Sequence, residues 1–300
     1  MGKFRMSWKK LLSARSQRPR SNKRISREGR EEEFSDYEKA ETVSTDLRSD
    51  FERDYHRILS SPSFRRLQDK TQVFPLEKND FIRTRLPHSI EVSSLGKSLA
   101  QSVANEIIRQ GLDEEFSYKE ANAICEILAS SGLLHDIGNP PFGHFGEDTV
   151  RAWFSKKLGN IHIKNEEGVM ESVKDIINAQ MYSDFLNFEG NAQAIRVASK
   201  LHFLIDENGM NLTYALLNTL IKYPVDSLSI NVKSNDIKTK KMGYYYAEKE
   251  LFKEIVMTTG TYDEKTGEVY RHPLTFLLEA ADDIAYCTAD VEDGVKKQFI

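Results

Sequence analysis

Leu133-Leu134-His135-Asp136-Ile137-Gly138-Asn139-Pro140-Pro141 closes an apolar run that starts near Ala121 and has the composition of a buried helix. Gly138 and the two prolines are typical helix terminators, which places His135 and Asp136 at the helix end. Both side chains can converge there on one small object, and an imidazole nitrogen with a carboxylate oxygen suits a divalent cation. The stretch therefore predicts a helical fold with a candidate metal-ligand pair. For an isolated His-Asp dipeptide, the alternative is a pair of polar residues that merely caps a buried helix.

A second pair of polar residues follows the helix break. His144 and Glu147 are three positions apart, so a helix would place them on one face. A histidine next to a carboxylate is a candidate acid–base pair for proton transfer. We therefore predict a catalytic role for His144 and Glu147.

Composition narrows the class of protein. The chain has 300 residues, of which 39% are hydrophobic and 29% charged, as in ordinary globular proteins. Its 42 basic and 46 acidic residues give a net charge of −4, which excludes a globally basic nucleic-acid binder.

No apolar run reaches membrane-spanning length. Cys125 and Cys287 both lie in apolar helical patterns, so we expect buried, reduced thiols in a cytoplasmic protein without a membrane partner.

The charge pattern predicts two parts. Residues 1–50 form a basic, partly flexible arm, because Lys and Arg dominate from Lys3 to Arg30. This arm is expected to be solvated and mobile; contact with single-stranded DNA or a neighbouring subunit and a transit peptide are alternatives. Residues 51–300 form one helical domain with few or no strands. Within it, residues 226–241 are polar and aperiodic, which predicts a mobile insertion.

His88 is a third ligand candidate. It falls in the first turn of a predicted long helix that ends at Gly111. The apolar stripe of that helix comprises Leu95, Leu99, Val103 and Ile107. An antiparallel hairpin with the following helix would bring His88 to His135 and Asp136.

A fourth candidate lies near the end of the chain. Asp282, Tyr286 and Asp290 recur every four positions along an apolar helix, and no Lys or Arg shares that stretch before Gly294. Carboxylates on a buried face require a cation or hydrogen-bond donors. We therefore predict Asp282 as a metal ligand.

Five strings combine these residues with their surroundings. They are Phe64-Arg65-Arg66-Leu67-Gln68-Asp69-Lys70-Thr71-Gln72-Val73-Phe74-Pro75, Arg83-Thr84-Arg85-Leu86-Pro87-His88, His135-Asp136-Ile137-Gly138-Asn139-Pro140-Pro141-Phe142-Gly143-His144, Asn187-Phe188-Glu189-Gly190-Asn191-Ala192-Gln193 and Glu279-Ala280-Ala281-Asp282-Asp283-Ile284-Ala285-Tyr286. In this order they resemble the deoxyguanosinetriphosphate triphosphohydrolases, a family of the HD-domain metal-dependent phosphohydrolase superfamily. The resemblance covers residues 6 to 300 and implies a mainly α, HD-domain helical bundle.

The resemblance also implies a reaction, the hydrolysis of a deoxynucleoside triphosphate, with dGTP expected, to deoxynucleoside and inorganic triphosphate. One divalent ion per site is implied, Mn²⁺ or Mg²⁺ first, with Fe, Co, Ni or Zn also compatible. The implied metal ligands are His88, His135, Asp136 and Asp282. His144 would transfer a proton near the α-phosphate and Glu147 would orient it. The implied substrate contacts are Arg85 to the triphosphate and Gln72, Tyr286 and Asp290 to the deoxyribose.

Members of that family extend well beyond residue 300 and assemble as multimers, so we expect residues 51–300 to lack the family's C-terminal part and the protein to form a homo-oligomer. Two other functions remain open. An HD phosphodiesterase or nucleotidase would act on another nucleotide or on single-stranded DNA. A dNTP-sensing module would bind a nucleotide without turnover.

Overall fold

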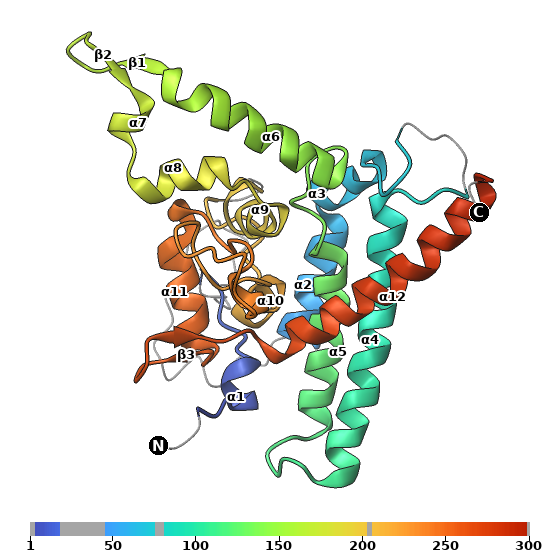
Figure 1. The fold of residues 1–300 in the computed structure, drawn as a ribbon. Coiled ribbons are helices and arrows are strands. Elements are labelled where there is room, and N and C mark those ends of the chain that lie inside the picture. The colour runs from blue at the N-terminus through green and yellow to red at the C-terminus, as the bar shows by residue number, and fades with distance from the viewer. Residues whose placement is uncertain (1–3, 19–45, 76–80, 203–205, 299–300) are drawn as a thin grey trace, which may run out of the picture.

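The computed structural model describes residues 4–18, 46–75, 81–202 and 206–298. Most of the predicted mobile arm, residues 19–45, lies outside this part. The fold is mainly helical, as predicted (Figure 1). The helices are α1 (Trp8–Leu11), α2 (Asp50–Ser60), α3 (Pro62–Arg65), η2 (Arg66–Asp69), α4 (Arg85–Gln110), α5 (Tyr118–Leu134), α6 (Gly143–Lys157), η3 (Leu158–Asn160), α7 (Val173–Ile176), α8 (Ala179–Leu186), α9 (Gly190–Arg196), η4 (Val197–Leu201), α10 (Tyr214–Leu220), η5 (Ile237–Thr239), η6 (Tyr246–Glu248), α11 (Lys249–Thr258) and α12 (Pro273–Lys296).

The described strands form two short antiparallel pairs, which agrees with the prediction of few strands. β1 (His162–Lys164) pairs with β2 (Met170–Ser172), and β3 (Tyr262–Asp263) pairs with β4 (Glu268–Val269). The first pair lies beyond the far end of α6 in Figure 1. None of the helices in the described ranges is both long enough and apolar enough to cross a membrane.

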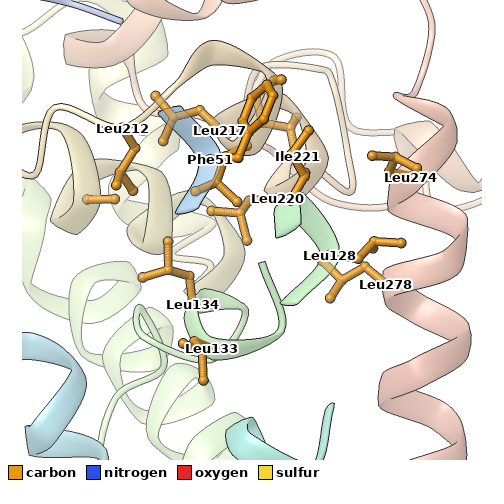
Figure 2. Packing of buried hydrophobic residues seen from close by; sticks show 14 of the residues in the cluster. Phe51, Leu128, Leu133, Leu134, Leu212, Leu217, Leu220, Ile221, Leu274 and Leu278 are labelled. Atoms are coloured by element: carbon orange, nitrogen blue, oxygen red, sulfur yellow. The ribbon is translucent and has the colours of Figure 1, made fainter. Parts of the chain in front are cut away.

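α5 is the central helix of the core. Ser117 and Glu120 form a capping box at its start, which satisfies backbone N–H groups that would otherwise lack acceptors. Its C-terminal half is buried, and α2, α4, α10 and α12 pack around it. Figure 2 shows Leu128, Leu133 and Leu134 of this helix among leucines of α10 and α12. The burial of α5 fixes the place where His135 and Asp136 leave the core.

The buried stripe of α4 differs from the predicted one. The structure buries Val92, Gly96, Ala100 and Ala104, whereas Val103 is exposed. The larger residues Leu95, Leu99 and Ile107 are only partly buried at the edges of the interface. Small residues allow α4 and α5 to lie close together, so the small stripe faces α5. The hairpin itself was predicted correctly, and α4 does end just before Gly111.

α12 crosses α4 and α5 and brings the end of the chain to them (Figure 1). His272 caps its N-terminus by accepting a hydrogen bond from the Leu274 N–H, and Pro273 occupies the first turn. The buried stripe consists of Leu274, Leu278, Ala281, Ala285 and Ala289. Cys287 lies off this stripe and is exposed, so the prediction that it is buried was wrong; Cys125 is buried as expected. Both thiols are free.

The described N-terminal segment, residues 4–18, packs on the helical body. Trp8 contacts the ring of Phe116, and Ser16 pairs with Thr213 in an isolated β-bridge. Residues 226–241, predicted to be a mobile insertion, are largely irregular apart from η5 and carry local hydrogen bonds such as Asn231 N–H to Thr239 O at 2.8 Å. The mobility of this segment and the one-domain boundary at residue 51 stay predictions.

Candidate metal and phosphate site

His88, His135 and Asp282 come together where α4, α5 and α12 meet. Their candidate ligand atoms lie within 4.8 Å of one another. Asp282 Oδ1 is 3.1 Å from His88 Nε2 and 3.4 Å from His135 Nε2. Both histidines are buried, and the Asp282 side chain is partly exposed. The structure therefore gathers three of the four predicted metal ligands.

The chemistry of this group fits a divalent cation. His135 Nδ1 donates to the Gly132 carbonyl oxygen at 2.7 Å, so Nε2 carries the lone pair. That Nε2 is buried and has no hydrogen-bond partner among the described residues. A backbone carbonyl that fixes the histidine tautomer is the usual support of a metal-binding imidazole. Two imidazole nitrogens and a carboxylate suit borderline transition-metal ions.

Asp136, the fourth predicted ligand, lies beside this group. Its Oδ2 is 3.6 Å from His135 Nε2 and pairs with the Arg85 guanidinium, and its Oδ1 accepts from Asn139 Nδ2 at 2.5 Å. Arg85 is buried at the start of α4, one turn before His88. The predicted phosphate-binding arginine is thus held against the metal-ligand group by a carboxylate.

Charges around the group favour ionised carboxylates. Burial opposes the ionisation of Asp282, but His135, His88 and Lys222 outweigh it and hold the pKa of Asp282 far below its ordinary value. Burial also opposes the ionisation of Asp136, yet His135 and Arg85 keep its pKa lowered. Burial alone would lower the pKa of His135. The carboxylates of Asp136 and Asp282 outweigh burial, so the pKa of His135 is raised. The two carboxylates are therefore held in the ionised form that a cation ligand requires.

His144 and Glu147 stand on the first turns of α6. Glu147 is fully buried and lies 2.9 Å from His144 Nδ1, while His144 is exposed. The hydrogen bond to Glu147 raises the pKa of His144. Burial opposes the ionisation of Glu147, but His144 and the Gly190 N–H, 2.8 Å from Oε1, lower its pKa overall. The predicted pair is formed, with His144 Nε2 free of Glu147.

None of the described hydrogen bonds or ion pairs joins the predicted sugar contacts to the metal-ligand group, although Asp290 is close enough to His88 for their charges to interact. Tyr286 and Asp290 follow Asp282 along α12, Tyr286 exposed and Asp290 half-buried. Gln72 follows η2, and its buried Oε1 has no hydrogen-bond partner among the described residues. A cavity of about 560 Å³ opens beside the segment that carries Gln72, with Thr71, Phe74, Thr84 and Phe142 among its walls. Among the described contacts, none joins Gln72 or Tyr286 to the three clustered ligands.

The comparison with known proteins decides the family. A family model described as "HD domain" matches residues 85–211, which contain His88, His135 and Asp136. A "Deoxyguanosinetriphosphate triphosphohydrolase-like protein" of Listeria monocytogenes is 56% identical over 257 residues, 86% of this chain and 52% of the relative. The chain belongs to the deoxyguanosinetriphosphate triphosphohydrolase-like family of HD-domain proteins.

Two further relatives of the triphosphohydrolase-like family show the same coverage. A protein with the same name from Synechocystis is 42% identical over 84% of this chain and 56% of its own length. A "Deoxyguanosinetriphosphate triphosphohydrolase" of Cronobacter sakazakii is 39% identical over 83% of this chain and 50% of its own length. The chain spans about half the length of the curated relatives it matches.

Two lysines near the site of this triphosphohydrolase-like chain were missed by sequence reasoning. The Lys222 side chain is mostly buried, and its Nζ lies 3.4 Å from Asp282 Oδ2. Asp282 and Glu279 raise the pKa of Lys222 against the opposing effect of burial. A charged residue directly after the apolar run of residues 212–221 was the available signal. Lys241 pairs with Glu189 at 3.0 Å. No role was predicted for Lys241, because it is the last residue of the predicted mobile insertion.

Proposed function

We propose that this protein hydrolyses a deoxynucleoside triphosphate, with dGTP as the first candidate, to deoxynucleoside and inorganic triphosphate in a metal-dependent reaction. The observation that carries the proposal is the convergence of His88, His135 and Asp282 next to the Arg85–Asp136 pair. Such a site combines a cation-binding group with a guanidinium suited to phosphate oxygens. The names of the family's members support the choice of substrate.

The metal would be held by His88, His135, Asp136 and Asp282. When bound, a divalent ion, Mn²⁺ or Mg²⁺ first, supplies positive charge that favours a nucleophilic water and neutralises phosphate. Arg85 would hold the triphosphate through the guanidinium edge that Asp136 leaves free. Lys222 and Lys241 would add positive charge along the same chain of phosphates.

The His144–Glu147 pair would move the proton. Glu147 accepts from Nδ1, which leaves Nε2 of His144 to exchange a proton near the scissile ester. The leaving 5′ oxygen of the nucleoside needs such a proton when its bond to the α-phosphorus breaks. Because Glu147 is buried and also accepts from the Gly190 N–H, it would fix the orientation of the imidazole.

The sugar would lie toward Gln72, Tyr286 and Asp290, beside the cavity between η2 and the start of α4. An aromatic ring packed on the ribose face discriminates against a 2′-hydroxyl by sterics. We also propose that the protein works as a homo-oligomer in the cytoplasm. Contact of the basic arm with single-stranded DNA stays the alternative to a solvated arm.

The test is incubation of the purified chain with each dNTP and Mn²⁺, with ³¹P NMR of the products. Inorganic triphosphate with deoxynucleoside is the expected result, and it should be lost in the double variant His135→Ala/Asp136→Asn. Monophosphate or pyrophosphate would instead indicate an HD phosphodiesterase or nucleotidase. No product, together with thermal stabilisation by a dNTP, would indicate a nucleotide-sensing module.

A further inference from the structure

Glu189 is a buried carboxylate that has no part in the roles above. It immediately precedes α9, and only 2% of its surface is exposed. Its carboxylate does not cap α9, although it stands at the N-cap position. A buried carboxylate is costly unless donors or a cation compensate it. The groups that contact the Glu189 carboxylate therefore indicate its role.

Within the part of the chain that the structure describes, two groups with hydrogen-bond donors contact this carboxylate. Asn191 Nδ2 donates to Glu189 Oε1 at 2.6 Å. Lys241 Nζ lies 3.0 Å from Oε2 and donates to Oε1 at 3.2 Å. The Lys241 side chain is about one-third exposed, so the protein does not fully enclose it. One carboxylate thus holds an amide and an ammonium together.

The same segment supports the acid–base pair. The next residue, Gly190, donates its N–H to Glu147 Oε1 at 2.8 Å. The Glu189 carbonyl oxygen accepts from Gln193 N at 2.9 Å and from Tyr245 Oη at 3.4 Å, which fixes the backbone at this point. Lys241 and Glu189 are both close enough to His144 to act on its charge. The layer of Glu189, Asn191 and Lys241 therefore lies beside the His144–Glu147 pair.

We propose that Glu189 is a positioning residue that holds Lys241 and Asn191 beside the His144–Glu147 pair, so that an ammonium and an amide face the phosphate chain of the substrate. The part that concerns substrate rests on the proposed function. The part that concerns the protein's own groups can be tested without turnover. Lysine has a long, flexible stem, so an anchored ammonium is better preorganised than a free one.

The first experiment measures the pKa of His144 by NMR of ¹³C-labelled histidine, with the signal assigned from His144→Gln. The charged groups that face His144 are Glu147 and Asp148 of α6, Glu189 before α9, and Lys241. Glu189→Gln keeps the shape but removes the negative charge, so the pKa of His144 should fall by about half a unit. Glu189→Asp keeps the charge, and the pKa should stay near that of the wild type.

The second experiment is a double-mutant cycle of thermal stability. Lys241→Met leaves Glu189 buried without its cation and should destabilise the protein, since one partner of a buried pair has been removed. Adding Glu189→Gln to Lys241→Met should restore much of the loss. Strictly additive effects, or a His144 pKa that is the same in wild type and Glu189→Gln, would overturn the proposal. Glu166→Gln, an exposed glutamate in the loop between β1 and β2, is the control and should change neither quantity.

Hydrolysis then separates this proposal from the proposed function. If the wild type releases inorganic triphosphate, Glu189→Gln should lower kcat/KM by about tenfold or more, and Glu189→Asp should recover part of it. If Glu189→Gln hydrolyses dNTP as well as the wild type does, Glu189 does not position the phosphate-facing groups. If the wild type has no activity, the proposed function fails, whereas the pKa and stability measurements still decide whether Glu189 organises these groups.

Discussion

His135 Nδ1 lies 2.7 Å from the carbonyl oxygen of Gly132, one turn earlier in α5. Gly132 also faces α4 so closely that a Cβ atom at this position would lie 2.5 Å from Ser93 Cα. A single glycine therefore sets both the tautomer of His135 and the separation of the helices that carry His88 and His135. The absence of a side chain at this position is a structural requirement of the site.

Gly132→Ala should destabilise the protein by about 1–3 kcal/mol, because overpacking forces the two helices apart. The free energy of unfolding in urea measures this loss. Gly159→Ala is the matched control, since the nearest heavy atom to its Cβ, Tyr182 Oη, is 3.8 Å away. Its effect should stay within about 0.5 kcal/mol. Equal stability of the two variants would show that α4 and α5 do not pack as closely as described.

His135→Ala and Asp282→Asn should each lose bound metal. Equilibration with Mn²⁺, removal of free ion and mass spectrometry of the metal would show one ion per chain in the wild type and none in the variants. His162→Ala, which removes an exposed histidine of β1, should bind as the wild type does. Chelation of the wild type should also lower its Tm, since an ion that binds only the folded state stabilises it. Full metal content in His135→Ala would rule out this cluster as the site.

His144→Gln should lower kcat for dNTP hydrolysis by about 10²–10⁴ while metal content stays unchanged. The reason is that His144 Nε2 is proposed to exchange the proton, whereas the metal-ligand group lies on other elements. Steady-state kinetics and metal analysis of the same preparation measure both quantities. His56→Gln removes an exposed histidine of α2 and serves as the control. A kcat near that of the wild type would remove His144 from the mechanism.

Arg83 joins the start of α4 to the end of α12. It lies 2.9 Å from the buried Asp293 and 2.7 Å from the exposed Glu292. Arg83→Met should cost about 3–5 kcal/mol in urea unfolding, because Asp293 would remain buried without its cation. Glu292→Gln removes the exposed partner of the same arginine and should cost less than about 1 kcal/mol. Similar losses in both variants would contradict the assigned difference in burial.

His272 should make stability depend on pH. Burial lowers its pKa from 6.5 to about 4 in the folded protein. Above pH 6.5 the contribution of His272 to stability is complete, because the imidazole is neutral in both states. Below pH 6.5 the unfolded chain binds a proton that the folded protein excludes, so the free energy of unfolding falls as the pH drops toward 4. The loss should be about 1.4 kcal/mol per pH unit.

Urea unfolding of wild type and His272→Asn at several pH values measures this contribution. Asparagine can still cap α12 but does not titrate, so the variant should lack the His272 part of the slope. Identical pH slopes for the two proteins would mean that His272 titrates normally in the fold.

Local sequence was enough to predict the long helices that carry the site and most of the candidate metal ligands. The glycine and prolines after His135-Asp136 end α5, and Gly111 ends α4. Each of these residues acts on the adjacent part of the chain, so the helix ends can be predicted from the sequence. Sequence periodicity was less successful at the α4 interface, because Leu95 and Leu99 seemed the obvious core residues. The structure buries the smaller Gly96, Ala100 and Ala104 instead, since close helix approach favours little side-chain volume. The prediction that Cys287 is buried was also wrong, because the side of a helix that faces the core depends on which elements pack against that helix.

The sequence by itself determined that a histidine and an aspartate end a buried helix, and that His144 and Glu147 share a helical face. The resemblance implied that Asp282 and His88 share a metal, and the tertiary structure places them 3.1 Å apart across 194 positions. Only the tertiary structure decided that Lys222 meets Asp282. It likewise decided that Glu189 holds Lys241, 52 positions away, beside His144. Helical spacing is a property of one segment and can be read from its residues. Contacts between distant segments depend on how whole helix faces pack, and the folded chain alone determines them.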